Sequence, residues 1–473
     1  MGYDYDLAII GGGSGGLVAA SSTAQLGLKV LLVEKERLGG DCLWYGCVPS
    51  KALIATGKRI HQVRTTAELG LPNVTTFSPN FRNIMQRMRD VQATIQPHDS
   101  PERFRKLGAD VQFGDPQFLS PHALRLGKKE YSFKYCIIAT GSSPFVPEIP
   151  GCEETGYLTN LNVFNLKKLP KEFVIIGAGP IGVELAQAFA RFGSNVTILA
   201  RSTLMSKEEP SVVQELTSVL EAEGINILYG KTPVHICKKG AKKQITLKNK
   251  QGRKTTIVCD EILIATGRKP NVAGLALEEA GVTYTEKGVT VNAYLQTSQK
   301  HIFAVGDVIG GHLFTHMAAS HASTAVRNMI SPLKAKAETA VIPWVTYTDP
   351  ELARVGMTAT EATEQDIAHQ ELSFAFKDAD RAITDDTRDG HIRVVVTPKG
   401  KILGATILGP QAGELLQEYV LAMKHGLSIK DIAATIHPYP TLSGASWTLA
   451  GSYYKQFLTK KTKAITKFLV RWF

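Results

Sequence analysis

Two stretches of the chain share one pattern, an apolar run followed by three spaced glycines and a second apolar run. The first stretch contains residues 5–10, then Gly11, Gly13 and Gly16, then residues 30–33 and Glu34. Apolar runs of this length are typical of buried parallel strands, and residues 17–26 between them are expected to be helical. The glycines allow a tight turn and a close approach of the backbone to a pyrophosphate, and the acid would accept a hydrogen bond from a ribose hydroxyl. Because all parts occur in the expected order, the stretch predicts a dinucleotide-binding βαβ unit.

The second stretch repeats the unit but lacks its acid. It contains residues 173–176, then Gly177, Gly179 and Gly182, then residues 196–199. Glu34 lies 23 residues after Gly11, and the position 23 residues after Gly177 is Ala200, followed by Arg201. A neutral residue beside Arg201, with Lys207 six positions further on, favours a 2′-phosphate and therefore NADPH over NADH. The alternative is that Arg201 and Lys207 are ordinary solvated surface charges.

Two cysteines follow the first unit, Cys42 and Cys47. In a regular helix a five-residue separation puts Cα atoms roughly 8 to 9 Å apart, whereas a disulfide needs roughly 4.4 to 6.8 Å. Closing the pair therefore requires a distorted turn, which Gly46 can supply, and strained disulfides are easily reduced. Pro49 can open a helix there, and its positive N-terminus would favour a Cys47 thiolate. The pair predicts a redox-active dithiol; the alternative is a stapling disulfide or two buried thiols.

Together these motifs resemble those of the pyridine nucleotide–disulfide oxidoreductases, which include glutathione reductase, dihydrolipoamide dehydrogenase and mercuric reductase. The resemblance covers nearly the whole chain. It includes two strand-and-turn elements (residues 138–141 and 264–268), a second flavin motif (residues 297–307) and the start of a dimerisation domain (residues 341–351). It implies an α/β fold with two doubly wound, Rossmann-like nucleotide-binding domains and a C-terminal α+β dimerisation domain.

The resemblance also implies domain boundaries. The expected segments are the first part of an FAD-binding domain (1–150), an NAD(P)H-binding domain (151–270), the second part of the FAD domain (271–340), a dimerisation domain (341–454) and a basic amphipathic tail (455–473).

Site roles follow from the same resemblance. The first nucleotide site would hold FAD, with Asp307 on its ribityl chain, and the second would hold NAD(P)H. Thr140, Gly141 and Gly267 match the turns that close the nucleotide domains. Lys51 and Glu184 match an ion pair beside the reactive nitrogen of the flavin. Cys47 matches the sulfur that faces the flavin, and Cys42 the sulfur that exchanges with substrate.

The chain departs from this family near its C-terminus. Family members that reduce small disulfides carry a histidine base and a glutamate partner there, but here Tyr439 and Gly444 occupy those positions. A phenol with a pKa near 10 is a poor base at neutral pH, and His437 lies two positions early. Tyrosine at this position resembles mercuric reductase, yet no cysteine follows Cys259 to receive Hg(II).

The predicted function is an FAD-dependent NADPH oxidoreductase whose electron acceptor is open: a disulfide, a metal ion or a quinone. The alternatives are a mercuric reductase or dihydrolipoamide dehydrogenase proper and, in another class, an NADPH-bound redox sensor or interaction protein. Outside Cys42 and Cys47 the cysteines lack ligand spacing, so we predict no metal site and expect Cys136, Cys152, Cys237 and Cys259 to be buried thiols.

Charge is concentrated in two regions of a chain whose net charge is +11. Residues 235–254 predict a solvated hairpin on the NADPH domain. After Asp431 there is no acidic residue, and the tail interleaves cations with apolar residues ending in Trp472 and Phe473. Such a helix predicts peripheral membrane contact; the alternative is that it packs on a homodimer. No apolar run is long enough to span a membrane. The six cysteines are typical of a protein in a reducing cytoplasm. No pattern typical of nucleic-acid binding is present, so we expect no nucleic-acid partner.

Overall fold

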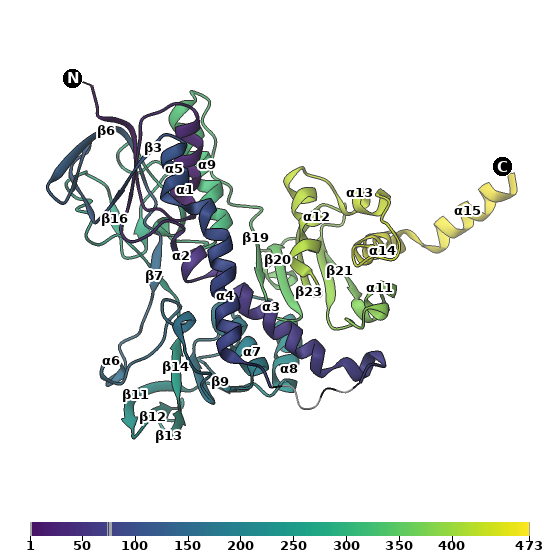
Figure 1. Cartoon of the computed structure of the whole chain (residues 1–473). Coiled ribbons are helices and arrows are strands. Elements are labelled where there is room, and N and C mark those ends of the chain that lie inside the picture. Colours follow the sequence, from purple (N-terminus) through teal and green to yellow (C-terminus); the bar gives the residue numbers. More distant parts are fainter. Residues whose placement is uncertain (1, 73, 75–77, 473) are drawn as a thin grey trace. The chain divides into compact units, whose positions relative to one another are not determined.

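The computed structural model describes residues 2–72, 74 and 78–472, so the Phe473 end of the predicted tail lies outside the described residues. The chain divides into two units (Figure 1). The first contains residues 1–65, 73–203 and 223–338, and the second contains residues 66–72, 204–222 and 339–473.

The first unit is built on a sheet with the strand order β3-β2-β1-β6-β5-β4, to which β18 adds beside β6. Its strands are β1 (Tyr5–Ile10), β2 (Val30–Glu34), β3 (Ala109–Phe113), β4 (Pro116–Ser120), β5 (Ala123–Leu126), β6 (Lys129–Ile138) and β18 (Ile302–Ala304). The pairs among β3, β2, β1, β6 and β18 are parallel. Ile9 pairs with Leu32 and Ile137, all without solvent exposure, which is why these strands are apolar along their length.

A second parallel sheet has the order β10-β9-β8-β14. Its strands are β8 (Glu172–Ile176), β9 (Asn195–Ala200), β10 (Asn226–Tyr229) and β14 (Glu261–Ile264), and helix α7 (Pro180–Phe192) follows β8. Next in the chain are the antiparallel strands β11 (Thr232–Lys239), β12 (Lys242–Lys248) and β13 (Lys254–Cys259).

The charged hairpin predicted at residues 235–254 is therefore part of a three-stranded sheet. Ile236, Ile245 and Leu247 are buried in one core with Cys259, so only the opposite face is solvated. Because side chains alternate along a strand, Cys237 points away from that core and is half-buried, unlike the buried thiol that was expected.

The remaining elements of the first unit are short strands and helices. The strands are β7 (Ser142–Pro144), β15 (Arg268–Pro270), β16 (Tyr284–Thr285) and β17 (Gly288–Val289). The α-helices are α1 (Ser14–Gln25), α2 (Gly40–Trp44), α3 (Cys47–Arg64), α4 (Phe81–Ile95), α5 (Pro101–Lys106), α6 (Cys152–Thr155) and α9 (Thr315–Ile330). The 3₁₀ turns are η2 (Gln96–Asp99), η3 (Val163–Asn165) and η4 (Gly306–Ile309). Helix α1 packs on α9, and α3 packs on α7.

The second unit contains an antiparallel sheet in the order β19-β20-β23-β22-β21. Its strands are β19 (Pro343–Thr346), β20 (Glu351–Gly356), β21 (Gln370–Ala375), β22 (His391–Val396) and β23 (Ile402–Gly409). Its helices are α8 (Pro210–Ala222), α10 (Ala359–Glu364), α11 (Asp380–Thr384), α12 (Ala412–Lys424), α13 (Ile429–Ala434), α14 (Gly444–Ser452) and α15 (Lys460–Trp472), with 3₁₀ turns η1 (Thr66–Leu69), η5 (Phe376–Asp378) and η6 (Tyr453–Phe457). Helix α12 packs on β20 and β23 around the buried Tyr419. The predicted fold class, two parallel nucleotide-binding sheets and a C-terminal α+β domain, is confirmed.

The tail becomes α-helical at Lys460, after the 3₁₀ turn η6, and each side chain of α15 is exposed. Among the described residues, no helix is both long enough and apolar enough to cross a membrane.

Candidate functional site

The two cysteines of the predicted dithiol lie on either side of a sharp turn between helices. Helix α2 ends at Trp44, and α3 begins at Cys47 with Gly46 as its N-cap. A Cβ atom at Gly46 would come within 2.9 Å of Asp41 Oδ2 and 3.0 Å of the Asp41 carbonyl oxygen, so a larger residue would require Asp41 to shift. The helix starts two residues before Pro49, which puts Cys47 in its first turn, and both cysteines are free thiols.

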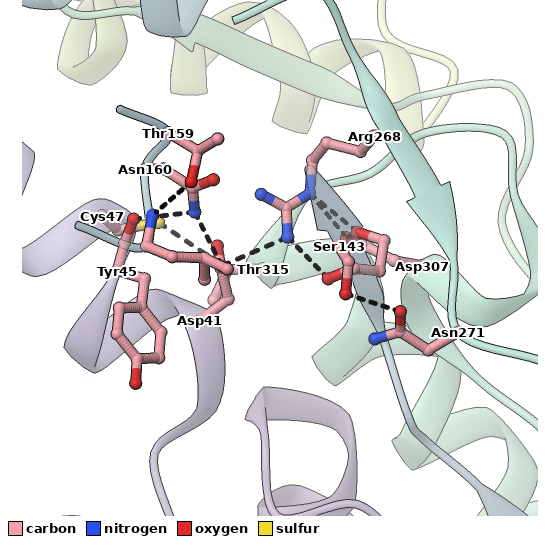
Figure 2. Close-up of polar contacts among 12 residues, drawn as sticks. Asp41, Tyr45, Cys47, Ser143, Thr159, Asn160, Arg268, Asn271, Asp307 and Thr315 are labelled. Carbon is pink, nitrogen blue, oxygen red and sulfur yellow. Dashed lines mark hydrogen bonds and ion pairs between the residues drawn. The ribbon is translucent and has the colours of Figure 1, made fainter. Parts of the chain in front are cut away.

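The surroundings of the two sulfurs differ. A hydrogen bond from Cys42 lowers the pKa of Cys47, and the Thr315 hydroxyl, 3.4 Å from Cys47 Sγ, and the Lys51 charge act in the same direction. The pKa of Cys42 is raised, first by that same hydrogen bond and then by burial. The arrangement therefore favours a thiolate at Cys47 and a protonated thiol at Cys42, and Figure 2 shows Thr315 beside Cys47.

Lys51 and Glu184 form the ion pair that the family resemblance predicts. The Lys51 Nζ atom lies 2.8 Å from Glu184 Oε2. Lys51 is on α3, one turn after Cys47, and Glu184 is on α7 with only 5% of its side chain exposed. The packing of α3 on α7 thus holds a cation close to the reactive sulfur.

The first glycine signature forms a close-packed phosphate-binding turn. Gly11 has a φ of +108°, and a Cβ atom there would lie 2.3 Å from the Ala139 carbonyl oxygen. A Cβ atom at Gly16 would overlap the Gly11 carbonyl oxygen, while Gly13 caps α1. The carboxylate of Glu34 at the end of β2 accepts from the Gly12 N–H at 2.6 Å and keeps further acceptor capacity for a ribose. This glycine turn, which has no side chains to block a phosphate, together with the neighbouring acid fits the adenosine diphosphate half of FAD.

The two closing turns of the nucleotide domains are joined to each other. Thr140 exchanges hydrogen bonds with Asn271, and Asn271 also donates to the Gly141 carbonyl. After Gly267 the chain enters β15, which pairs antiparallel with β7. Asp307 lies next to these turns and accepts from the Ser142 hydroxyl at 2.6 Å. Burial raises the pKa of Asp307.

Arg268 is a central residue of this region that sequence reasoning did not single out. Its guanidinium donates to both the hydroxyl and the carbonyl of Ser142, lies 3.2 Å from Asp41 Oδ1 and 3.8 Å from Asp307 Oδ2, and is 11% exposed (Figure 2). The only sequence signal is an arginine after the second closing turn, and its partners lie far away in the chain.

The second glycine signature repeats the geometry of the first. Gly177 approaches the Ala265 carbonyl, Gly182 approaches Gly177, and Gly179 caps α7. Arg201, directly after β9, is exposed in the first unit. Lys207 belongs to the second unit, where its carbonyl accepts from Arg354 Nη1 at 2.7 Å. The two predicted phosphate ligands are therefore held by different units.

Tyr439 lies on an exposed loop before α14 in the second unit. Its hydroxyl donates to Asp380 Oδ2 at 3.0 Å, and this bond raises its pKa further, so the phenol is a weaker acid than usual. Gly444 begins α14 and has no carboxylate to offer.

His437, on the same loop, is engaged on both ring nitrogens. Its Nδ1 lies 2.9 Å from the Thr435 carbonyl, and its Nε2 lies 2.9 Å from Glu418 Oε1. Both ring nitrogens are therefore already engaged within the second unit, and neither is directed at an open site. Glu418 is a partner that sequence reasoning did not anticipate.

The other cysteines offer no second redox pair. Cys136, Cys152 and Cys259 are buried. Burial raises the pKa of Cys136 and raises that of Cys259 to about 12. Within the described ranges, no three histidine, cysteine or acidic side chains are placed to hold a metal ion together.

Comparison with known proteins identifies the family. Residues 5–327 match the pyridine nucleotide-disulphide oxidoreductase family, and residues 342–450 match its dimerisation domain. The chain is 32% identical over 444 residues to a mercuric reductase of Bacillus cereus, covering 93% of this chain and 70% of the relative. It is 34% identical over 449 residues to a dihydrolipoyl dehydrogenase of Geobacillus stearothermophilus, covering 92% and 93%.

Among solved structures, the HOCl-induced flavoprotein disulfide reductase RclA from Escherichia coli superimposes with a TM-score of 0.84 at 27% identity, covering 94% of this chain and 99% of that one. The chain belongs to the pyridine nucleotide–disulphide oxidoreductases. It is accordingly an oxidoreductase that uses FAD and a pyridine nucleotide, and its dimerisation domain favours a homodimer.

Proposed function

We propose that this protein is an NADPH-dependent flavoprotein reductase that works through a redox-active Cys42–Cys47 pair. The observation that carries the proposal is the unequal pair of sulfurs, with Cys47 favoured as thiolate beside Lys51 and Cys42 held as a thiol. A structural disulfide would need no such difference. FAD bound at the first glycine signature would take up a hydride from NADPH and deliver two electrons to the disulfide.

The residues of the chain then have separate roles. Cys47 would face the bound flavin as a thiolate, which the Thr315 hydroxyl and the Lys51 cation stabilise. Glu184 fixes Lys51 in place. Cys42, with its higher pKa, retains the proton and attacks or binds the acceptor once deprotonated.

NADPH is the proposed reductant because Ala200 leaves the second site without an acid and Arg201 is exposed directly after it. An arginine fork matches the geometry of a phosphate.

Among the acceptors, the site favours a metal ion that the two cysteine sulfurs can bind. Reduction of a disulfide or a quinone consumes protons, and Tyr439 and His437 are poorly suited to supply them. Reduction of a metal ion by NADPH instead releases one proton: one Hg(II) takes two electrons, or two Cu(II) take one each. Among the proteins that resemble this chain are mercuric reductases and a flavoprotein disulfide reductase solved as a Cu(II) complex.

An anaerobic titration with NADPH tests the dithiol. Two-electron reduction should give a long-wavelength absorbance band that reports the Cys47 thiolate beside the flavin. Cys47→Ser should lose the band, whereas Cys42→Ser should show it without any reductant. Cys152→Ser, which changes a buried thiol elsewhere in the unit, is the matched control. Bleaching of the wild type directly to reduced flavin without this band contradicts the proposal.

The tail suggests where the enzyme works. Helix α15 is exposed throughout, and no acidic side chain accompanies its cations. We extend the proposal to a cytoplasmic homodimer that associates peripherally with anionic membrane surfaces through its two tails.

A further inference from the structure

The dithiol loop carries an acid directly before the exchanging cysteine in the chain. Asp41 precedes Cys42, and 38% of its side chain is exposed. The preceding Gly40 is packed so closely that a Cβ atom there would lie 2.6 Å from Gly13 Cα, in the phosphate-binding turn. The hydrogen bond with Cys47 and burial raise the pKa of Cys42 most, and the negative charge of Asp41 acts in the same direction.

Arg268 compensates this charge. Its Nη2 lies 3.2 Å from Asp41 Oδ1, and its Nε lies 3.8 Å from Asp307 Oδ2. The arginine is itself fixed by two hydrogen bonds to Ser142, of 2.7 and 2.8 Å. One cation thus faces two carboxylates, one beside the exchanging sulfur and one in the flavin motif (Figure 2).

A neighbouring amide fixes the Asp41 end of this cluster. Asn160 Nδ2 donates to Asp41 Oδ1 at 2.9 Å and to the Tyr45 carbonyl at 3.0 Å. Asn160 therefore joins the start and the end of the turn that separates the two cysteines. The Arg268 contact enters the same turn from β15, which follows the second nucleotide-binding sheet.

We propose that Arg268 is a positioning residue of the dithiol, which neutralises Asp41 and so keeps Cys42 reactive. The proposal rests on the proposed role of Cys42 as the exchanging sulfur. The hydrogen bond with Cys47 and burial already raise the pKa of Cys42, and without Arg268 the full charge of Asp41 would add to this effect. Replacing both Arg268 and Asp41 by neutral residues would remove one positive and one negative charge, so the net charge near Cys42 would stay almost the same.

The test measures thiol reactivity rather than turnover. Holoenzyme reduced with dithiothreitol is treated with iodoacetamide at a fixed neutral pH, and alkylation of Cys42 is followed by mass spectrometry. Arg268→Gln should slow this alkylation by roughly 3- to 10-fold, as expected for one unit charge at short range near a surface. Asp41→Asn should accelerate it, and Asp41→Asn combined with Arg268→Gln should return it to within about twofold of the wild type.

Two further variants complete the design. Lys269→Gln removes the adjacent exposed cation and should leave alkylation unchanged. Arg268→Lys keeps the charge and should retain most of the Cys42 reactivity. If Arg268→Gln folds poorly, the single variants Arg268→Lys and Asp41→Asn still test the proposal. A double variant as slow as Arg268→Gln alone, or an equal effect of Lys269→Gln, overturns the proposal. Failure of NADPH to reduce the dithiol would overturn the proposed function while leaving these alkylation rates informative.

Discussion

At the scale of single residues, the chemistry of the site depends on how differently two nearby sulfurs are surrounded. Cys47 begins a helix, lies 3.4 Å from a hydroxyl and is close to the Lys51–Glu184 pair. Cys42 lies beside the carboxylate of Asp41. Helix position, hydrogen bonding and charge all favour the thiolate at the same sulfur.

The Thr315 hydroxyl should set the acid limit of this thiolate. Because it lowers the pKa of Cys47, the long-wavelength band should persist at a pH where an ordinary thiol is protonated, and disappear as the pH falls through that lowered pKa. Thr315→Val removes the bond, so the band should disappear at a pH higher by about one unit. Thr315→Ser keeps a hydroxyl and is the matched control. Identical midpoints for Thr315→Val and the wild type in an anaerobic pH titration would show that the hydroxyl is not a partner.

Arg201 should determine nucleotide choice. We expect a higher kcat/KM for NADPH than for NADH, and Arg201→Ala should remove most of the difference. A charge-assisted contact is worth about 1.5 to 3 kcal/mol, or roughly 10- to 100-fold in this ratio. Lys250→Ala, at an exposed turn of the same unit, should leave the ratio unchanged. Equal use of both nucleotides by the wild type would refute the assignment.

At the scale of elements, we expect the loop between α13 and α14 to determine which acceptors are reduced slowly. It carries a hydrogen-bonded phenol, Tyr439, where disulfide reductases have a base, and a doubly engaged imidazole, His437, two positions earlier. General acid–base assistance is typically worth about 100- to 10,000-fold. Lipoamide and glutathione disulfide should therefore be poor substrates.

Restoring the base should reverse this preference. Tyr439→His with Gly444→Glu should raise kcat for lipoamide or glutathione disulfide and leave reduction of a metal-ion acceptor little changed. His437→Gln should lower thermal stability, because Glu418 loses its partner, without lowering turnover of either class. Family-typical disulfide reduction by the unmodified enzyme, or its loss in His437→Gln, would show that a base is already present.

Elements with a strong local pattern were predictable from sequence, whereas long-range pairings were not. The strand predicted at residues 5–10 is β1 (Tyr5–Ile10), because a buried parallel strand is apolar on both faces. The third strand of the charged sheet, β13, was missed because its first half, Lys254 to Thr256, is polar and shows no apolar alternation. The contacts of Arg268 with Asp41 and of His437 with Glu418 depend on how separate elements pack, which no local pattern encodes.

At the scale of the whole molecule, a homodimer would carry two copies of the C-terminal tail and so strengthen any binding that one tail provides. The matched dimerisation domain covers residues 342–450 and ends before the tail. In α15 the side chains of Ile465, Phe468, Leu469 and Trp472 are 48%, 60%, 47% and 72% exposed. Six cations accompany them without an acid: Lys455, Lys460, Lys461, Lys463, Lys467 and Arg471.

These tails should bind anionic membranes. The apolar face can enter the headgroup boundary while the cations approach lipid phosphates, each contributing roughly 1 kcal/mol. The full chain should sediment with vesicles that contain phosphatidylglycerol, less with pure phosphatidylcholine, and less at high salt.

A variant ending at Tyr454 should stay in the supernatant with its NADPH oxidation intact. Replacing Ile465 and Leu469 by serine should also abolish binding while preserving every charge, which separates insertion from simple attraction. Because a dimer presents two tails, its binding should be much tighter than that of the isolated peptide. If the full and shortened chains partition equally, the tail does not bind lipid and the prediction is wrong.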